Sequence, residues 1–469
     1  MLKWACIILL AAILLISVLE FTTNRTPLEQ FTAARPGGQG GDKTVIRLGI
    51  AGWQLEEFPW QQALDSYQRA HPDVQVQPSL LAGTVNNLLL FWQRGHTEFD
   101  VVVSWADFEI TPFIEYNQSN PDVSARSLLV DMTDYIPSEK LRRDFMNALF
   151  AGSSRTDKAS GRWSLYELPW MGEVLALNYN RMFFAQRNVQ VPRTWEELEQ
   201  ACQALQGLRY TKPGSGDTIE VAPITMNFTT FFAQNCYIPL LASYKKGAGI
   251  GDDKGRLDVS SPQAAQVLTT LKRWYDAGYI SRNSLDINSS EQDLRVLHSA
   301  MYPHWQSRGL WAIKENSRQV IGIAPTPGYQ QSGVGSLVCS YGAIVPKCSP
   351  VKKAAVAFAY ETFCTDTYGF QSAVAAGFED PVTRAHKGGG KMPALREIYK
   401  EGSNLDPEIQ ALRPAMEQGY TYPDPNNWNQ VSIILAAEFQ KLLSNKHPSA
   451  EACLAAVRAR LAEEVYPQK

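Results

Sequence analysis

The sequence predicts an α/β protein whose folded body begins near residue 44. From there to the C-terminus, short apolar stretches of strand length alternate with longer stretches whose apolar residues recur at helical spacing. Of the 469 residues, 45% are hydrophobic and 19% are charged, which is enough apolar material for a packed core and excludes wholesale disorder.

The first part of the body has the order β-α-β-α-β. Residues 45–50 are expected to form a buried strand, and residues 58–67 carry apolar side chains at helical spacing. A second strand is expected at 74–77, a second helix at 85–92 and a third strand at 99–103. In open α/β sheets, ligands bind at the carboxyl ends of strands. The chain just after the first and third strands is therefore a candidate site.

The later part of the body continues the alternation. Thr194 and Glu197 form a capping box in front of a predicted helix. Further strands are expected at 319–324 and 343–346, and Ser349 with Pro350 opens an Ala-rich helix. The last two helices are expected at 428–443 and after Ser449.

The N-terminus is predicted to lie outside the folded body. Lys3 precedes an uninterrupted apolar run from Trp4 to Leu19. A helix of that length spans about 24 Å, short of a hydrocarbon core of ~30 Å. Residues 1–21 are therefore interpreted as a signal peptide or membrane anchor, and the lack of an evident cleavage site favours the anchor. The Pro- and Gly-containing stretch 22–43 is expected to be a flexible linker.

Charge and cysteine usage narrow the class of partner. Lys and Arg number 44 and Asp and Glu number 47, so nucleic acid is not an expected partner.

Export implies an oxidising compartment. The body contains six cysteines, which allow fifteen disulfide pairings. Without a C-x-x-C motif, we expect mostly buried free thiols with at most one disulfide bridge. The six cysteines are Cys202, Cys236, Cys339, Cys348, Cys364 and Cys453.

Motifs for catalysis, metals or cofactors are poor. The six His are scattered, the glycines at 388–390 do not make a P-loop, and no G-x-S-x-G elbow occurs. We therefore expect no catalytic residues, no metal ligands and no cofactor.

The chain resembles the family 1 extracellular solute-binding proteins of ABC importers, the group that includes maltose- and glycerol-phosphate-binding proteins. The resemblance covers nearly the whole body and rests on the order and spacing of individually weak blocks. The main blocks are His71–Val76, Gly161–Pro169, Leu177–Arg181, Val191–Leu198, Asp252–Gly255, Ile321–Pro327 and Tyr341–Pro346. A lipobox is missing, which departs from the lipid-anchored form of the family.

This resemblance implies a two-lobe periplasmic-binding-protein fold of type II. Each lobe would be a sheet flanked by helices, with the ligand cleft between the lobes. The first lobe would comprise 44–167 plus 328–380, and the second 168–327 plus 381–469. The family works on the periplasmic or cell-surface side, where residues 4–19 would tether this chain to the cytoplasmic membrane. The implied partners are a small-molecule solute, most simply a carbohydrate, and the transmembrane subunits of an ABC permease.

Aromatic residues beside polar side chains are the best candidates for a sugar site. A pyranose ring lies flat on Trp or Tyr, and its hydroxyls need carboxylates and amides as hydrogen-bond partners. Such groups occur where strands or hinge segments are expected to end, and Trp428 is interpreted as a core residue instead. The predicted ligand-binding residues are Trp53, Gln54, Glu56, Trp105, Asp107, Trp170, Glu173, Asn227, Trp305, Arg308, Ser336 and Tyr341.

Two alternatives stay open at this point. The same receptor class could take a phosphorylated compound, another anion or iron, and Arg308 beside Trp305 is compatible with an anion. A carbohydrate-active enzyme would instead need two carboxylates about 5–10 Å apart across the cleft, for which Glu56, Asp107 and Glu173 are candidates.

Overall fold

The protein is described from a computed structural model, which covers residues 43–55, 57–105, 109–117, 119–120, 123–214, 216–329, 336–379, 386–387, 389–400, 403 and 405–467. The predicted anchor and nearly all of the predicted linker lie outside these residues. Within the part of the chain that is described, no helix combines the length and the apolar character that crossing a membrane requires.

Strands come from both halves of the chain and are mostly short. They are β1 (Thr44–Ala51), β2 (Val74–Leu81), β3 (Val101–Trp105), β4 (Ser154–Thr156), β5 (Trp163–Leu165), β6 (Leu168–Asn180), β7 (Arg209–Thr211), β8 (Thr218–Glu220), β9 (Met301–Trp305), β10 (Ile321–Pro325), β11 (Val338–Ile344), β12 (Phe378–Glu379), β13 (His386–Lys387) and β14 (Met392–Pro393).

Helices alternate with these strands. They are α3 (Trp60–Ala70), α4 (Leu89–Gln93), α5 (Thr111–Ile114), α6 (Val123–Arg126), α7 (Ser138–Asp144), α8 (Arg181–Arg187), α9 (Trp195–Leu205), α10 (Ile238–Tyr244), α11 (Pro262–Asp276), α12 (Ile287–Asp293), α13 (Gln306–Glu315), α14 (Lys352–Phe363), α15 (Phe370–Ala376), α16 (Pro407–Ala411), α17 (Arg413–Gln418), α18 (Trp428–Leu443) and α19 (Ala450–Arg460). Short 3-10 segments include η1 (Gly52–Gln54), η2 (Val85–Leu88), η4 (Asn147–Phe150) and η7 (Arg396–Tyr399), and a π-helical turn, η5 (Ala233–Tyr237), precedes α10.

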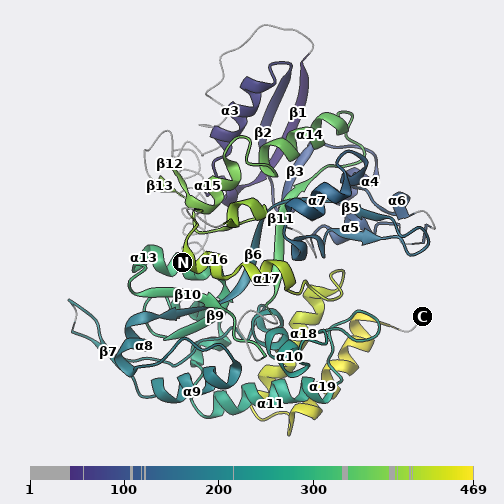
Figure 1. Cartoon of the computed structure of the whole chain (residues 1–469). Coiled ribbons are helices and arrows are strands. Elements are labelled where there is room, and N and C mark those ends of the chain that lie inside the picture. The colour runs from purple at the N-terminus through teal and green to yellow at the C-terminus, as the bar shows by residue number, and fades with distance from the viewer. Residues whose placement is uncertain are drawn as a thin grey trace, which may run out of the picture.

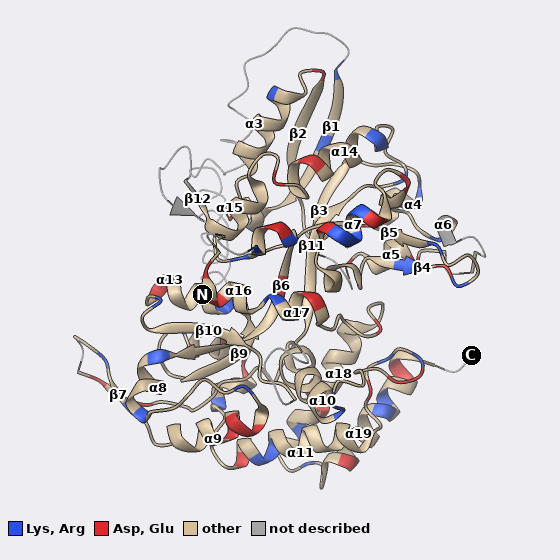
Figure 2. Ribbon diagram, in the orientation of Figure 1, with Lys and Arg blue, Asp and Glu red and all other residues tan. Residues whose placement is uncertain are grey.

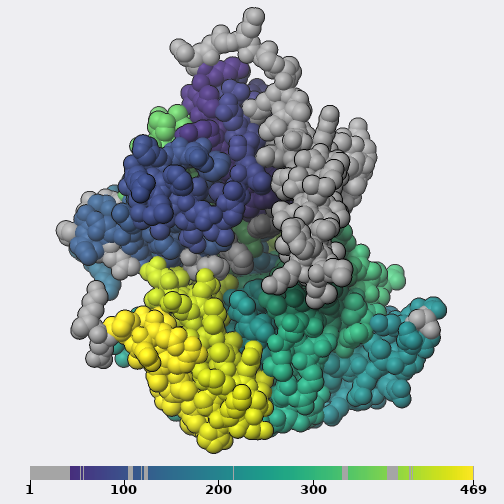
Figure 3. All heavy atoms as spheres, turned by 180° about the vertical axis from the view of Figure 1, so that it is seen from behind, coloured from purple at the N-terminus to yellow at the C-terminus, as the bar shows by residue number. Residues whose placement is uncertain are grey.

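Two lobes share one sheet. Its order is β10-β6-β11-β3-β1-β2, with β9 and β14 also paired to β6. Strands β1, β2 and β3 are parallel and form the upper lobe with α3 and α14, whereas β9 and β10 lie in the lower lobe with α8 to α13 (Figure 1). Seen from behind, the C-terminal helices form one side of the lower lobe (Figure 3). The mixed α/β fold that the sequence predicts is thus confirmed.

Strand β6 joins the two lobes. All thirteen of its residues are buried. Its first half pairs antiparallel with β11 and β14, and its second half with β9 and β10. The change of partners occurs around Val174 and Leu175, so the chain crosses between the lobes inside a single strand rather than in a loop. The proposed lobe boundary at residue 168 stays a prediction.

Most sequence-predicted elements match observed ones. The first strands and helices correspond to β1, α3, β2, η2 with α4, and β3, and the predicted helix 428–443 has the bounds of α18. The Thr194 hydroxyl accepts the Glu197 backbone N–H at 3.2 Å, as a capping box requires. The Glu197 carboxylate reaches one residue further than in the standard box and accepts the Arg193 backbone N–H at 2.6 Å.

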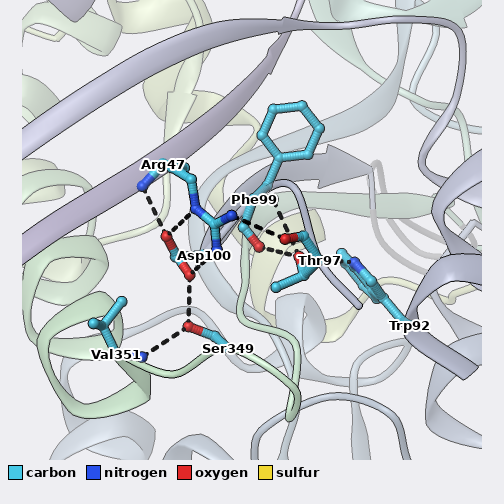
Figure 4. A network of polar contacts seen from close by, with 7 residues as sticks. All are labelled: Arg47, Trp92, Thr97, Phe99, Asp100, Ser349 and Val351. Carbon is cyan, nitrogen blue, oxygen red and sulfur yellow. Dashed lines mark hydrogen bonds and ion pairs between the residues drawn. The ribbon is translucent and has the colours of Figure 1, made fainter. Parts of the chain in front are cut away.

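A buried carboxylate ties the upper lobe together (Figure 4). Asp100 accepts hydrogen bonds from the Arg47 guanidinium on β1 and from the Ser349 hydroxyl before α14, at 2.8 Å in each case. Burial alone would raise the pKa of Asp100, but the hydrogen bonds from Arg47 and Ser349 outweigh it, and the pKa is lowered. Elsewhere, Lys, Arg, Asp and Glu occur mainly in the helices and loops of both lobes (Figure 2).

The six cysteines of the body are free thiols, and all but Cys348 are buried. Burial raises the pKa of Cys236 and of Cys453 to about 12. These thiols are therefore protonated at neutral pH and act as small apolar core groups. The expectation of mostly buried free thiols is confirmed.

The ion pair between Asp258 and Lys245 predicts a pH-dependent stability. Lys245 Nζ lies 2.8 Å from Asp258, and the backbone N–H groups of Ser260 and Ser261 each donate to the same carboxylate at 3.0 Å. These hydrogen bonds outweigh the effect of burial and lower the pKa of Asp258 to about 2. Because the unfolded value is about 3.9, the carboxylate stabilises the fold above about pH 4, and this contribution is lost as the pH falls towards 2.

We expect Asp258→Asn to lower the free energy of unfolding by about 2 kcal/mol at pH 7. The difference in the free energy of unfolding between the variant and the wild type should shrink as the pH falls below 4, because the wild-type carboxyl then also loses its charge. Urea denaturation at pH 7, 5 and 3 measures this. Asp253→Asn, at an exposed residue, is the matched control and should leave stability unchanged. A gap that stays constant with pH would contradict the assignment.

Candidate ligand-binding site

A cavity of about 690 Å3 opens at the middle of β6. Its wall takes Met171 and Glu173 from β6 and Tyr341 from β11. It also includes Glu57 from the upper lobe and residues of α13 and α18 from the lower lobe. The cavity is therefore bounded by segments that are far apart in the sequence and belong to both lobes.

Aromatic rings form the inner wall. Trp305 and Trp428 are each 2% exposed, and Tyr422 packs against Trp428 with 4.9 Å between ring centroids. Trp305 ends β9 directly beside Leu175 of β6, so the sheet register sets its position. Phe231, just before the π-helical turn η5, completes this wall. Such rings offer flat apolar faces in a water-poor space.

Hydrogen bonds fix the polar groups of the wall. Glu173 is 6% exposed and accepts a hydrogen bond of 3.1 Å from the Tyr341 hydroxyl. Burial and the charge of Glu173 raise the pKa of Tyr341 well above its usual value, so the phenol keeps its proton and remains a donor. Gln306 Oε1 accepts the Val174 backbone N–H at 2.7 Å. The Gln306 amide nitrogen thus remains as a donor beside an acceptor carboxylate.

Both cations in the wall have acidic partners. Lys391 forms an ion pair with Glu57, and its ammonium group lies 4.9 Å from the centroid of the Phe58 ring. Arg308 Nε lies 3.2 Å from Glu291 on α12. Among the wall residues that the structure describes, Glu173 is the carboxylate without a basic partner. The described part of the wall therefore has no uncompensated positive charge.

His304 lies behind the wall and is fully buried. Its Nδ1 accepts the Trp305 backbone N–H at 2.8 Å, which places the ring proton on Nε2. Burial, with a smaller contribution from the nearby charge of Arg308, lowers the pKa of His304 well below its usual value. The imidazole therefore stays neutral and packs edge-on against Phe231, with 5.1 Å between ring centroids.

Helix α13 is held close to β6 by a glycine. A Cβ at Gly309 would lie 2.8 Å from Ile323 Cγ1 and would also collide with the Asn178 side chain. Only glycine lets the helix approach the strand at this distance. This approach places Arg308 and Trp311, which flank Gly309 on α13, at the cavity.

Four of the sequence-predicted site residues line the cavity: Glu173, Trp305, Arg308 and Tyr341. They come from four different elements or their ends, and the fold brings them together. A role in binding ligand remains a prediction for each of them.

Trp170 is not brought to the cavity, and the prediction that its ring lines the cleft is wrong. It is 0% exposed and makes edge-to-face contacts with Phe58, Trp60 and Phe370, at centroid distances of 4.7, 5.8 and 5.4 Å. This cluster belongs to the core of the upper lobe. The sheet register shifts here, since Tyr341 of β11 pairs with Met171 and Gly342 pairs with Pro169, so Trp170 is the extra residue of a β-bulge in β6.

Three polar residues predicted for the site lie elsewhere. Asn227 is buried and bonds to Ser290 and Thr229 in its own lobe. The Ser336 hydroxyl donates to the Leu175 carbonyl oxygen at 2.9 Å and secures the backbone. Gln54 lines a separate pocket of about 440 Å3 at the end of β1. In this structure, none of the three lines the cavity.

The remaining predicted residues cannot be placed at the site. Glu56, Asp107 and the side chains of Trp53 and Trp105 lie outside the described part of the chain. Their involvement in binding stays a prediction.

Sequence reasoning missed most of the wall. The wall residues that are not among the predicted ligand-binding residues are Glu57, Met171, Thr230, Phe231, Gln234, Gln306, Ser307, Trp311, Lys391, Tyr422, Trp428, Asn429, Ser432 and Ile433. For Met171 a signal existed, because period-two alternation places it on the same face of β6 as Glu173. For Tyr422 and Phe231 no local pattern marks a cavity, since they meet only through the tertiary fold.

Comparison with known families identifies the class. Residues 54–361 match the family described as bacterial extracellular solute-binding protein, and the chain belongs to this family. No curated protein sequence matches the chain at a significant level.

Solved structures share the fold. Maltose-bound MalE3 of T. maritima is 16% identical, with a TM-score of 0.64 over 90% of this chain and 99% of that one. The GacH receptor of Streptomyces glaucescens is 14% identical, with a TM-score of 0.63 over 91% of this chain and 100% of that one. A substrate-binding protein of Listeria monocytogenes in complex with cycloalternan is 17% identical, with a TM-score of 0.59 over 90% of this chain and 99% of that one.

The location of Trp170 predicts a stability defect without a binding defect. Trp170→Ala removes a fully buried ring from an aromatic cluster and should lower the free energy of unfolding by about 3–5 kcal/mol. Urea denaturation of the apo protein measures this. Trp170→Phe, which keeps a ring, should lose clearly less. Normal stability together with lost ligand affinity would show that the ring faces the ligand after all.

Proposed function

We propose that this chain is the extracytoplasmic substrate-binding receptor of an ABC importer for a sugar or oligosaccharide. The two lobes would close on the ligand and deliver it to a permease. The observation that carries this proposal is the wall of the cavity, which combines buried aromatic rings with a carboxylate that has no basic partner.

The wall has the chemistry that a sugar needs. The apolar C–H face of a pyranose can stack on Trp305 or Trp428, which are rigid and excluded from water. Its hydroxyls can donate to Glu173 and accept from the Gln306 amide. Since Tyr341 and Val174 hold these two groups in place, little entropy is lost when a ligand binds.

The paired cations favour a neutral ligand over the anionic alternative. A phosphate or carboxylate site would need cations or backbone N–H groups that are free to bind it. Here Lys391 is paired with Glu57 and Arg308 with Glu291. The three similar structures are of proteins in complex with maltose, acarbose and cycloalternan, which supports a carbohydrate. Family and neighbours are binding proteins, and we propose no enzymatic activity.

The partner and location follow the family. A receptor of this class would dock on the transmembrane subunits of a permease on the periplasmic or cell-surface side. We propose that residues 4–19 tether it to the cytoplasmic membrane, since the apolar run lacks an evident cleavage site.

A ligand screen tests the function. Maltose, maltotriose, chitin oligosaccharides, a sugar phosphate, inorganic phosphate and ferric citrate are compared by thermal shift. A neutral sugar at a hundred times its Kd should add about 2.7 kcal/mol of stability. Stabilisation by phosphate, the sugar phosphate or ferric citrate alone would favour the non-sugar alternative and contradict the proposal.

The Glu173 carboxylate gives a second, sharper test. Glu173→Gln keeps the shape of the side chain and can still accept the hydrogen bond from the Tyr341 hydroxyl. It loses the negative charge, which strengthens hydrogen bonds from hydroxyl groups. We expect roughly tenfold weaker sugar binding in calorimetry. Glu463→Gln, at an exposed residue of the C-terminal segment, is the control and should bind normally. Unchanged affinity in the Glu173 variant would mean that the site acts by stacking alone.

The tether is tested by N-terminal sequencing of the protein extracted from membranes. We expect the apolar run Trp4–Leu19 to be still attached. A mature N-terminus near Thr22 would show instead that the segment is a cleaved signal peptide.

A further inference from the structure

The rim of the cavity carries exposed apolar side chains. Trp311 on α13 is 37% exposed and Ile433 on α18 is 57% exposed, and both line the cavity. Their neighbours Leu310 and Ile313 pack against the hydrophobic core, whereas Trp311 belongs to none of the apolar clusters formed by the described residues. Trp311 therefore lies outside the apolar core of the described residues.

A fixed cation covers one face of the Trp311 ring. The Arg308 guanidinium carbon lies 4.1 Å from the ring centroid. Glu291 on the neighbouring helix α12 holds the Arg308 Nε at 3.2 Å. The two Nη groups of Arg308 make no hydrogen bond with the residues that the structure describes. The guanidinium is thus oriented and charge-compensated but keeps donors that can be used by a ligand.

The inner and outer rings differ in exposure. Trp305 and Trp428 are almost fully buried, while Trp311 stands at the mouth of the same cavity. A large exposed ring that packs on no core typically marks a binding surface. The volume of about 690 Å3 lies within the range of pockets that enclose a whole drug-sized ligand, and is more than a single six-membered ring needs.

We propose that Trp311 and Arg308 form an outer subsite that holds a further sugar residue of an oligosaccharide. The ligand then extends from the inner wall at Trp305 and Trp428 past Trp311 towards solvent. The free face of Trp311 stacks on the outer sugar, and the Arg308 Nη groups donate to its hydroxyls. This inference rests on the proposed function and adds the size class of the ligand, an oligosaccharide rather than a monosaccharide or disaccharide.

Calorimetry with sugars of increasing length tests the outer subsite. Maltose, maltotriose and maltotetraose, and the corresponding chitin oligosaccharides, are titrated into the full chain and into Trp311→Ala. In the wild type, Kd should fall as the sugar lengthens. Trp311→Ala should raise Kd about tenfold for the tetrasaccharide and less than twofold for the disaccharide.

Two further variants make the result specific. Trp311→Phe keeps an aromatic ring and should retain most of the increase in affinity that the wild type shows as the sugar lengthens. Phe91→Ala removes an exposed ring of α4, far from the cavity in the upper lobe, and should change neither binding nor its dependence on length. The melting temperature of apo Trp311→Ala should equal that of the wild type, because the ring packs on no core.

Three outcomes would overturn the inference, and they are distinguishable. A wild-type affinity that does not depend on sugar length shows that no outer subsite exists. An equal loss at every length in Trp311→Ala shows that this ring serves the inner wall. If neither sugar series binds the wild type, the proposed function itself fails before any variant is compared.

Discussion

The structure depends on one continuous buried strand, β6. Its first half completes the sheet of the upper lobe, and its second half forms the sheet of the lower lobe with β9 and β10. Because the backbone hydrogen bonds of both lobes converge on this strand, its position is fixed from both sides. Close packing adds to this, since a Cβ at Gly172 would lie 2.8 Å from Leu149 and collide with Met416 of α17. The cavity opens at the point where the strand changes partners, so residues of both lobes contribute to its wall.

The buried polar side chains of β6 divide between structure and function. Asn180 accepts the Phe183 backbone N–H at 3.1 Å and caps α8, and Asn178 donates to the carbonyl oxygen of Tyr302 at 3.1 Å. Glu173 has a single described side-chain partner, the neutral Tyr341 hydroxyl. Burying a carboxylate with so little compensation is unfavourable for folding, and such groups concentrate at functional sites. Asn178 and Asn180 thus serve the fold, and Glu173 is the buried polar side chain of β6 that we propose for ligand binding.

The sequence was informative about the fold wherever the signal was local. Helix caps such as Thr194 and the alternation of strands and helices depend on neighbouring residues, and the structure has these features where they were predicted. The site was predicted only in part. The sequence pairs Trp170 with Glu173 as an aromatic residue beside a carboxylate, but the β-bulge at Trp170 and its packing against Phe58 and Trp60 have no local sequence signal. Trp428 is buried, as a core interpretation expects, but its place on the cavity wall depends on the tertiary packing of α18, which local sequence does not show.

The charges around the cavity explain how such a site can be both selective and reversible. Cations paired off with Glu57 and Glu291 cannot hold an anion strongly, so binding has to come from stacking and from hydrogen bonds to fixed groups. Each of these contributions is modest, which allows a ligand to leave once the lobes open. Behind the wall, the imidazole of His304 has its pKa lowered by burial and by the charge of Arg308, and it stays neutral as the pH varies around neutrality. A described wall without uncompensated positive charge, carrying oriented donors and acceptors, would therefore make affinity depend on the shape and hydroxyl pattern of the proposed ligand.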